Sequence, residues 1–486
     1  MLFRSLKDAH VSSMVPSTYK SNLGFLVDRV EGKALIDVID RLRLPEQLFP
    51  FQKGDQLIAI DGVPVEKLVA ELNESSNTGN AESSIRIATA RLTSRKQASG
   101  FAVPKGVSTI TVLPKGAAQP VTVTATWITS GTPILDLDDL KDLKDDDNSA
   151  VATASNGSAL LAELKKMDQF KSVMPKSFVE DMKQIGVADI GNPKSMFKLP
   201  EGSKDLPGLP VTAAIYEAAG KKIGILRIPH YSDDGLLEVL ARALMVMEQQ
   251  TDALVLDQTN NPGGSVSLVS DIVSLFADKS FTDMNFKIRP SMNWIKKMDD
   301  INTKIAEMIA ADPSDFAANA LKARFQYISE ELRESIAQKR FLTKPISLNL
   351  TGTYGIIQPN RVVRYTKPVL LLINEFDFSG GDAFPAIMKD NGRVTLFGTR
   401  TTGAGGNVAE YGPLANSFFK FNLTESLMVR PNGQYVENYG VRPDVSYSIT
   451  EDDFMNDYRG YVKAFTVEAL KLSGASEADI EAYKAK

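Results

Sequence analysis

The fold is decided by residues 367–406, which read KPVLLLINEFDFSGGDAFPAIMKDNGRVTLFGTRTTGAGG. Val369 to Ile373 is an unbroken apolar run, which predicts a strand buried on both faces of a parallel sheet. Turn-compatible residues follow it, and Ala383 to Lys389 then has the pattern of a helix. Ser379 lies on this bend, directly before two glycines. The stretch therefore predicts a serine displayed at the carboxyl end of a buried strand.

A bend of this kind contains the groups that acyl transfer requires. The hydroxyl of Ser379 is a candidate nucleophile, and the backbone N–H of Gly380 is a candidate donor to an oxyanion. A lone serine in such a position is more often an ordinary turn residue. The choice between a nucleophile and a turn residue therefore needs a second observation.

A second Gly-rich bend supplies that observation. An apolar run ending at Asp257 is followed by the letters QTNNPGG, and Val266 to Phe276 then predicts a helix. The N–H groups of Gly263 and Gly264 would lie at the start of this helix, in the positive field of its dipole. Two such bends in one sheet could supply two oxyanion donors, one from Gly380 and one from Gly263 or Gly264.

These segments resemble the tail-specific, or C-terminal processing, serine proteases. The shared patterns are D-x-x-N-N-P-G-G after one strand, x-N-E-x-x-x-S-x-x-[DE] after another, and G-V-R-P-D at Gly440 to Asp444. The resemblance covers most of Lys222 to Tyr447. It implies an α/β, crotonase-like protease core with a parallel-rich sheet, hydrolysis of peptide bonds, protein or peptide substrates, and no cofactor.

The sequence departs from the common bacterial branch of this family at the general base. In that branch a lysine in a T-x-G-K-G tract accepts the serine proton, whereas Ala404 stands at the corresponding position here. Lys389 is too close to Ser379 in sequence to replace it. Either another group accepts the proton, or the chain is an inactive pseudoprotease that binds peptides as a scaffold. A hydrolase of small esters or amides on the same fold is a further alternative.

Only two histidines are present, His10 and His230. The L-x-D-x-H context of His10, and the position of Glu437 shortly before the G-V-R-P-D tract, resemble the chlamydial and tricorn-type branch, which has a Ser–His–Glu triad. The resemblance implies Ser379 as nucleophile, His10 as general base and Glu437 as the carboxylate that orients the imidazole. An imidazole that titrates near neutrality suits this proton transfer.

Other residues could take these roles. His230 follows an apolar run and is expected to pack in the core or to lie at the rim of the cleft, with a smaller chance of being the base. Glu410 and Glu425 are alternatives to Glu437. His10 could also be an ordinary histidine near the chain terminus.

Composition argues against several other function classes. The 486 residues carry a formal net charge of −5, which disfavours a nucleic-acid partner. No apolar run approaches the roughly 20 residues that span a bilayer, so no transmembrane segment is expected. The absence of cysteine excludes disulfides and a thiol nucleophile, and two distant histidines cannot form a typical zinc site. We therefore expect neither a metal nor another cofactor.

The expected location follows from the family resemblance rather than from a targeting sequence. Met1 to Ser12 lacks the long apolar core of a secretory signal. The resemblance implies a periplasmic or secreted protease, so we expect that this chain is a processed form that has lost a leader. We also expect that two copies can form a homodimer.

A PDZ-like domain is expected before the protease core. Residues 54–62, GDQLIAIDG, resemble the G-D-x-[IL]-x-x-[IVL]-[DN]-G core of a PDZ domain. Val65 to Leu72 predicts the following helix, and Val107 to Val112 and Val121 to Thr126 predict the last strands. An insertion at Asn73 to Ala98 departs from the pattern. Such a domain either binds a substrate peptide as an added strand or is degenerate and only packs.

The chain is thus expected to divide into four segments. These are an N-terminal segment with His10 (1–20), the PDZ-like domain (21–132), an acidic flexible linker with helices (133–205), and the protease core (206–486) with a helical cap inserted at about 290–340. The Asp-rich tract after Pro133 cannot offset its ordering entropy. We expect autoproteolysis within it, between Leu137 and Leu160.

Overall fold

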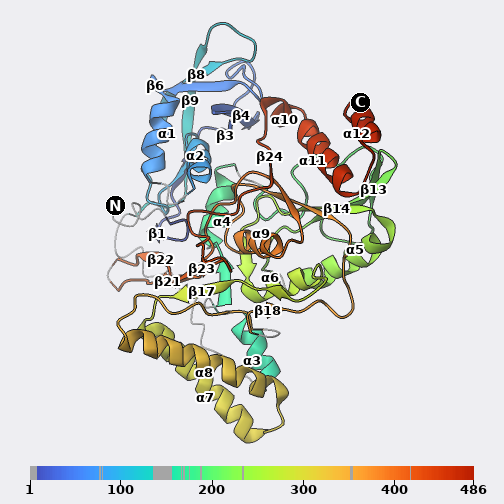
Figure 1. Ribbon diagram of the computed structural model, residues 1–486. Helices are drawn as coiled ribbons and strands as arrows, with labels where there is room; N and C mark the ends of the chain where they lie inside the picture. Colours follow the sequence, from blue (N-terminus) through green and yellow to red (C-terminus); the bar gives the residue numbers. More distant parts are fainter. Residues whose placement is uncertain are drawn as a thin grey trace.

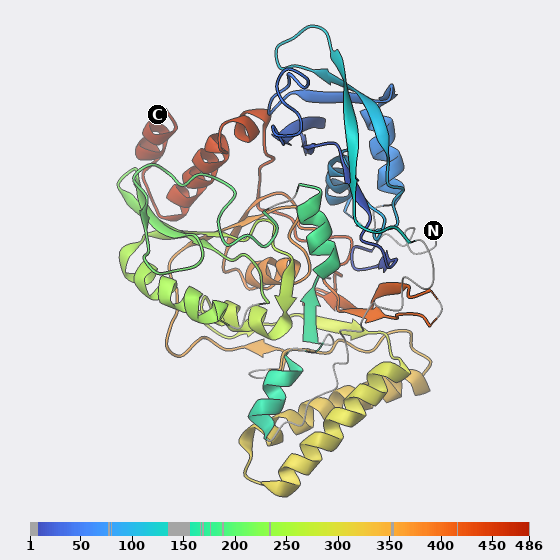
Figure 2. The ribbon, with the colours of Figure 1, turned by 180° about the vertical axis from the view of Figure 1, so that it is seen from behind.

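The computed structural model describes residues 8–75, 78, 80–134, 156–165, 167, 170–174, 176–186, 189–232, 235–350, 354–415 and 417–485. They form a β-rich region, an α/β core and a helical hairpin, which follow one another from top to bottom in Figure 1. Figure 2, seen from behind, shows that the first strand of the chain lies beside strands that come late in the sequence.

The core is built on a seven-stranded sheet of order β11-β12-β13-β14-β19-β20-β24. Its strands are β11 (Lys204–Asp205), β12 (Ala213–Ala218), β13 (Lys221–Arg227), β14 (Ala253–Asp257), β19 (Val369–Ile373), β20 (Thr395–Gly398) and β24 (Val445–Ser446). The five strands from β13 to β24 run parallel to one another. Strand β12 pairs in the antiparallel direction with both of its neighbours, β11 and β13. Every residue of β14 and β19 is buried. The prediction of a parallel-rich α/β core is confirmed.

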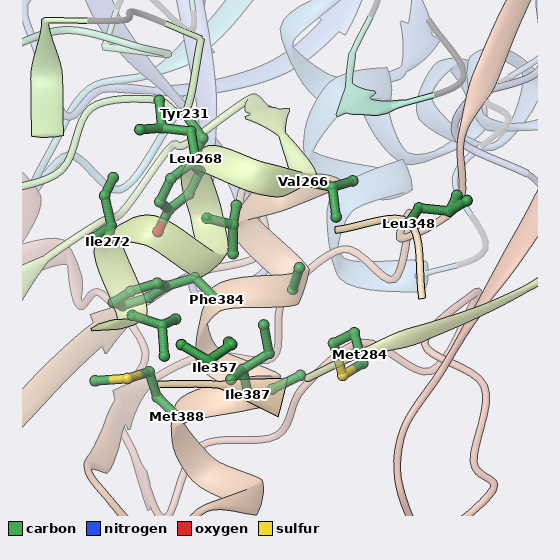
Figure 3. Close-up of a cluster of buried hydrophobic side chains, with 14 of the residues drawn as sticks. Tyr231, Val266, Leu268, Ile272, Met284, Leu348, Ile357, Phe384, Ile387 and Met388 are labelled. Carbon is green, nitrogen blue, oxygen red and sulfur yellow. The ribbon is translucent and has the colours of Figure 1, made fainter. Parts of the chain in front are cut away.

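Helices cover both faces of this sheet, because its central strands present apolar side chains on both sides. The covering helices are α5 (Leu236–Gln250), α6 (Val266–Ser274), α9 (Gly380–Asp390) and α11 (Arg459–Leu472). Leu371 faces α5, α6 and α9, and Figure 3 shows part of this cluster with Ile272 of α6 and Phe384 of α9. Leu370 points to the opposite face and packs with Phe465 of α11.

The N-terminal region contains an eight-stranded sheet of order β3-β4-β5-β8-β9-β2-β7, with β6 paired to β5. Its elements are β2 (Lys20–Asn22), β3 (Phe25–Val30), β4 (Lys33–Ile39), β5 (Gln56–Ile60), β6 (Val63–Pro64), α1 (Val65–Glu74), α2 (Ala81–Ala90), β7 (Ser94–Lys96), β8 (Gly106–Leu113) and β9 (Val121–Ser130). Strand β3 is at one edge. The expected helix and last two strands are present as α1, β8 and β9.

Helix α2 lies within the stretch that the sequence pattern presented as an insertion. Its buried face contains Ser83, Ser84 and Thr89 beside Ile87, so its hydrophobic periodicity is weak. Hydrogen bonds to other parts of the chain stabilise this helix in place of a continuous apolar face. Asn80 caps the helix by accepting from Glu82 N, and its side-chain amide donates to a carbonyl of the core, Thr401 O (2.8 Å).

A helical hairpin, α7 (Met292–Ala311) and α8 (Phe316–Ala337), extends from the core, where a helical insertion was expected. Ser291 and Asp315 cap its two helices. The second carboxylate oxygen of Asp315 accepts from Gly157 N, at the start of α3 (Gly157–Leu164), and thereby joins α3 to the hairpin. Among the described residues, none of the helices is both long enough and apolar enough to span a membrane.

Short pairings join segments that are distant in sequence. Their strands are β1 (Ser12–Met14) with β22 (Lys420–Thr424) and β21 (Val408–Tyr411); β10 (Lys171–Val173) with β15 (Gly263–Ser265); β16 (Phe281–Thr282) with β18 (Ile356–Ile357); and β17 (Asn285–Ile288) with β23 (Ser426–Val429). The pairing of β1 with β22 fixes the start of the chain against the core. The segment expected to be cut lies largely in residues 135–155, outside the described residues.

Some element boundaries differ from those expected. The sequence predicts one last helix over Asp452 to Leu472, whereas the structure has two, α10 (Glu451–Met455) and α11, because Asp457 and Tyr458 adopt positive φ angles of 54° and 60°. Helix α4 (Lys176–Gln184) is separated from α3 by β10, and a short helix, α12 (Glu477–Lys484), ends the described chain.

Candidate active site

Ser379 occupies a strained bend between β19 and α9. Helix α9 starts at Gly380, earlier than predicted, with Ser379 as its N-cap residue at φ 62° and ψ −111°. The Ser379 N–H donates to Asp382 Oδ2 (2.9 Å), while the Ser379 carbonyl accepts from Asp382 N (2.9 Å). Positive φ is costly for a residue with a Cβ and is characteristic of a nucleophile placed on a sharp strand-to-helix turn.

The structure brings His10 to Ser379 across 369 positions of sequence. His10 Nε2 lies 3.1 Å from Ser379 Oγ, and both side chains are buried. The His10 segment is fixed on both sides: its backbone N–H donates to Asp8 Oδ1 (2.9 Å), and β1, which starts two residues later, pairs with β22. Asn422 of β22 also donates to Ser12 Oγ (2.8 Å). The imidazole is therefore within hydrogen-bonding distance of the hydroxyl.

The surroundings of His10 favour its neutral form. Burial lowers the pKa of His10 from 6.5 to about 4, and the negative charge of Asp8 opposes this shift only in part. At neutral pH the ring is consequently uncharged, so one of its two nitrogens has a free lone pair. This is the state that a general base requires.

Glu437 is half-buried near this site but is not hydrogen-bonded to His10. Its Oε1 accepts from Met428 N (2.8 Å). Its Oε2 and His10 Nδ1 are buried atoms with no hydrogen-bond partner in the described part of the chain. Burial raises the pKa of Glu437 to about 8, a shift that the Met428 N–H opposes and that the negative charges of Asp8 and Asp382 increase. Glu437 is thus mainly protonated at neutral pH.

The alternative residues have other surroundings. Glu425 accepts from Trp294 Nε1 (3.0 Å) and from the Tyr411 hydroxyl, and Glu410 forms an ion pair with Lys420 (3.0 Å). Lys389 lies at the far end of α9 and forms an ion pair with Asp444 (2.8 Å). His230 is half-buried beside the 263–264 bend, where its neighbour Tyr231 forms a bridge to Gly264.

The two Gly-rich bends meet beside Ser379. A Cβ at Gly380 would lie 3.0 Å from Gly264 N and 3.2 Å from Gly263 Cα. The Gly263 N–H already donates to Asn261 Oδ1 (2.8 Å), and Gly264 is paired with Ser172 of β10, so the Gly380 amide is the clearest candidate for an oxyanion donor. Gly264 cannot be replaced without rearrangement, because its φ is 158° and an added Cβ would lie 2.0 Å from the Tyr231 carbonyl carbon.

Asp382 fills the [DE] position of the pattern x-N-E-x-x-x-S-x-x-[DE], but the sequence alone assigned it no role in this site. Its Oδ1 accepts from Gly403 N (2.8 Å), and its Oδ2 accepts from Ala404 N (2.9 Å) as well as from Ser379 N. The carboxylate therefore fixes the 403–404 loop against the nucleophile bend. Its position three residues after Ser379 is the capping-box position, which is a signal that could have identified it.

Asp377 joins the two Gly-rich bends through hydrogen bonds from its carboxylate to their backbones. Its Oδ1 accepts from Asn261 N (3.0 Å) and its Oδ2 from Asn374 N (3.0 Å), so one side chain holds both loops. Gln258 also donates to Asp377 Oδ2 (3.2 Å) and, in turn, accepts from the Tyr231 hydroxyl (2.8 Å). Burial raises the pKa of Asp377 well above its usual range.

Comparison with protein families identifies two regions of the chain. The family model for peptidase family S41 matches residues 222–447, and the model for a PDZ domain matches residues 19–134. The first range contains Ser379, Glu437 and both Gly-rich bends, and the second contains the eight-stranded sheet.

Several known proteins are similar to this chain. A Chlamydia trachomatis protein is 28% identical over 457 residues, covering 84% of this chain and 72% of the relative. A Chlamydia pneumoniae protein is 28% identical over 521 residues, covering 98% and 81%. A probable CtpA-like serine protease of Staphylococcus epidermidis is 23% identical over 250 residues, covering 51% and 38%.

Among solved structures, mature CPAF complexed with lactacystin has the same fold, with a TM-score of 0.75 over 98% of this chain and 88% of that chain at 23% identity. A further structure of mature CPAF gives a TM-score of 0.70 over 97% of this chain and 86% of that chain at 24% identity. Together with the two family matches, this likeness extends over both regions of the chain. Residues 222–447 are therefore a region of peptidase family S41, residues 19–134 are a PDZ domain, and the chain is a serine peptidase.

Proposed function

We propose that this protein is a serine endopeptidase in which Ser379 is the nucleophile, His10 the general base and Glu437 the carboxylate that orients the imidazole. The proposal rests on one observation above all: the 3.1 Å distance between His10 Nε2 and Ser379 Oγ. Ala404 occupies the position of the lysine base, and its backbone N–H is bound to Asp382, so the imidazole is the base next to the hydroxyl.

The reaction follows from these positions. Ser379 Oγ attacks the carbonyl carbon of the scissile peptide bond while His10 Nε2 accepts the hydroxyl proton. The Gly380 N–H and a second donor from the 263–264 bend stabilise the resulting oxyanion. The imidazolium then donates its proton to the leaving amine, which departs and leaves an acyl-enzyme on Ser379. Water, deprotonated by His10, attacks the ester, and the proton returns to Oγ as the new carboxyl product leaves.

Glu437 is assigned as the orienting residue because two buried atoms lack partners. A hydrogen bond from His10 Nδ1–H to Glu437 Oε2 would satisfy both atoms and would leave Nε2 free to accept the serine proton. Ionised Glu437 would also stabilise the imidazolium that forms during the reaction. Formation of the triad therefore requires a small movement that closes this contact and the loss of the Glu437 proton.

Substrates are expected to be proteins or peptides, as the peptidase family implies. Strand β3 is an edge strand of the PDZ domain, so its free edge could take up an extended peptide as an additional strand. The proposal includes autoproteolysis between Leu137 and Leu160, a periplasmic or secreted location, and a homodimer. Comparing the wild-type chain with Ser379→Ala after incubation tests the first of these: cleavage must occur only in the wild type.

An active-site probe tests the assignment of the base. A fluorophosphonate should label the wild-type chain but not Ser379→Ala, and His10→Gln should slow labelling by about 10²–10⁴-fold, the usual contribution of a general base. His230→Gln is the matched control and should label at the wild-type rate. Rapid labelling of His10→Gln, or slow labelling of His230→Gln alone, would overturn the assignment.

Substrate assays separate an endopeptidase from a small-ester hydrolase. The endopeptidase should cut unfolded casein at internal bonds, and the fragments should be visible by mass spectrometry. Hydrolysis of p-nitrophenyl acetate without cleavage of casein would contradict the proposed substrate class.

A further inference from the structure

A cavity of about 100 Å³ lies behind the segment that carries the proposed base. Ala9 and Val11, the two neighbours of His10 in sequence, line one side of it. The C-terminal end of α2 and the strand β7 of the PDZ domain line another side, and α4 lines a third. The cavity therefore lies where the N-terminal strand, the PDZ domain and helix α4 meet.

The cavity contains a buried guanidinium that is only partly satisfied. Arg91 is 6% exposed, and its Nη2 donates to Asp181 Oδ2 (2.5 Å). Its Nη1 is buried and has no hydrogen-bond partner among the described residues, and the same holds for Asp181 Oδ1. A charged donor left unpaired in the interior costs substantial free energy, so it calls for an explanation.

The guanidinium is also held in a fixed orientation. Its central carbon lies 4.4 Å from the centre of the Phe101 ring, which is typical of a cation–π contact, and the ion pair with Asp181 fixes one nitrogen. Neither Asp181 nor Phe101 accepts a hydrogen bond from Nη1, so this nitrogen is available to a ligand. An oriented and unpaired guanidinium N–H is suited to bind an anion, and a planar carboxylate in particular.

We propose that this cavity binds a monocarboxylate with a short apolar chain, whose carboxylate accepts from Arg91 Nη1. The charged residues that line the cavity are Arg91, Lys96 and Asp181. Two positive charges and one negative charge leave an excess of one positive charge, which a single carboxylate neutralises. The rest of the lining consists of serine and threonine residues and of apolar side chains, and the apolar ones, among them Met14, Ile87 and Phe178, favour a short apolar chain on the ligand.

The volume limits the ligand to a small group. A cavity of about 100 Å³ accommodates a small acid or the terminal residue of a peptide rather than a longer extended peptide. The carboxylate could belong to a free short-chain acid or to the terminal residue of a peptide. Both sources present the same group to Arg91, and the probes below distinguish them.

Binding is measured on the Ser379→Ala chain, so that the result does not depend on the proposed catalysis. Propionate represents the free acid and N-acetylalanine the peptide terminus, while propionamide and N-acetylalaninamide are their uncharged controls. We expect saturable binding of at least one carboxylate by titration calorimetry, with a Kd on the order of 1 mM for such small ligands, and at least tenfold weaker binding of the matching amide.

Two variants show whether binding occurs in this cavity. Arg91→Lys keeps the charge but loses the planar fork, and it should weaken carboxylate binding at least tenfold. Ala98→Leu narrows the cavity without touching the ion pair between Arg91 and Asp181, and it should weaken binding similarly. Lys279→Gln, far away in sequence and outside the cavity lining, is the control and should bind as the unaltered chain does.

The outcomes are distinct. Carboxylate binding that both Arg91→Lys and Ala98→Leu weaken supports the site, and preference for propionate or for N-acetylalanine identifies the source. If Arg91→Lys fails to fold, as judged by its melting temperature, Ala98→Leu decides alone. Equal binding of acids and amides, binding unaffected by Ala98→Leu, or no saturable binding of either acid would overturn the proposal.

Discussion

The backbone of Ser379 is strained where the chemistry is proposed to occur. A φ of 62° places this residue in a region that residues with a Cβ rarely adopt, and surrounding hydrogen bonds maintain it. The bend displays Oγ toward His10 and leaves the following N–H close to Gly264. Local strain of this type is therefore directly linked to the arrangement of nucleophile, base and oxyanion donors.

Gly264→Ala tests the oxyanion donors. The added Cβ would lie 2.0 Å from the Tyr231 carbonyl carbon, so the 263–265 strand must move relative to Tyr231, which displaces the donors of the 263–264 bend. Loss of one donor lowers kcat by roughly 10²–10³-fold, and that is the decrease we expect with a peptide substrate. Gly433→Ala, with a φ of 84° but no atom within 4 Å of its added Cβ, is the control for backbone strain. Comparable losses in both variants would contradict the assignment.

The pKa shifts predict an unusual pH profile. Because the pKa of His10 is lowered to about 4, the base is already neutral above that pH. Because the pKa of Glu437 is raised to about 8, its carboxylate forms only as the pH rises through that value. We expect kcat/KM to increase near pH 4 and again near pH 8, and Glu437→Gln to lose the second increase. A single increase near pH 6.5 would show that burial does not control these groups.

Part of this site could be predicted from the sequence. The Ser379 bend and the two glycine pairs followed from local sequence patterns, because strand, turn and helix signals lie close together there. His10 and Glu437 could be selected only through resemblance to a known family, since nothing local indicates that they meet Ser379. The absence of a hydrogen bond between His10 and Glu437 depends on side-chain packing, which a sequence pattern does not contain.

Helix α9 depends on a carboxylate that also holds a neighbouring loop. Asp382 accepts from the N–H groups of Ser379, Gly403 and Ala404, so the start of the helix and the 403–404 loop form one unit. Strand β1 plays a comparable part for His10, since its pairing with β22 sets the position of the residues before it. The site is thus assembled from elements that fix one another through backbone hydrogen bonds.

Asp382→Asn should disturb this unit. The amide nitrogen of asparagine cannot accept a hydrogen bond, so at least one of the three N–H groups loses its partner. We expect a loss of about 1–3 kcal/mol in the free energy of unfolding and a decrease in kcat of at least about tenfold. Asp479→Asn, at the exposed start of α12, should change stability by no more than about 0.5 kcal/mol. Denaturant titration and steady-state kinetics measure both effects.

Secondary structure could be predicted where the hydrophobic pattern is strong. It could not be predicted where tertiary contacts determine whether a helix or strand forms. The apolar run Val369 to Ile373 gave β19 with the expected bounds, and the run ending at Asp257 gave β14, since burial on both faces leaves a clear pattern. Helix α2, with its small and polar buried face, gave no such pattern. The interruption between α10 and α11 depends on two left-handed residues that nothing in the sequence marked as a turn.

The PDZ domain is connected to the peptidase region by charged contacts. Arg86 of α2 binds both Asp28 of β3 and Glu375, which lies between β19 and the nucleophile bend (2.7 Å each). Arg91 forms a second connection from the PDZ domain, to Asp181 of α4, a helix that precedes the peptidase region. The segment carrying His10 runs between these regions, so the site depends on the arrangement of the whole molecule. A single sequence cannot predict such contacts, because they join residues hundreds of positions apart.

Chemical rescue of His10→Gly tests the central claim most directly. Removing the ring leaves a buried space beside Ser379, and the variant should lose about 10²–10⁴-fold in kcat. Added imidazole should raise the kcat of His10→Gly at least tenfold, in a saturable and pH-dependent manner. It should not change the activity of Ser379→Ala. Wild-type activity in His10→Gly without imidazole would contradict the account.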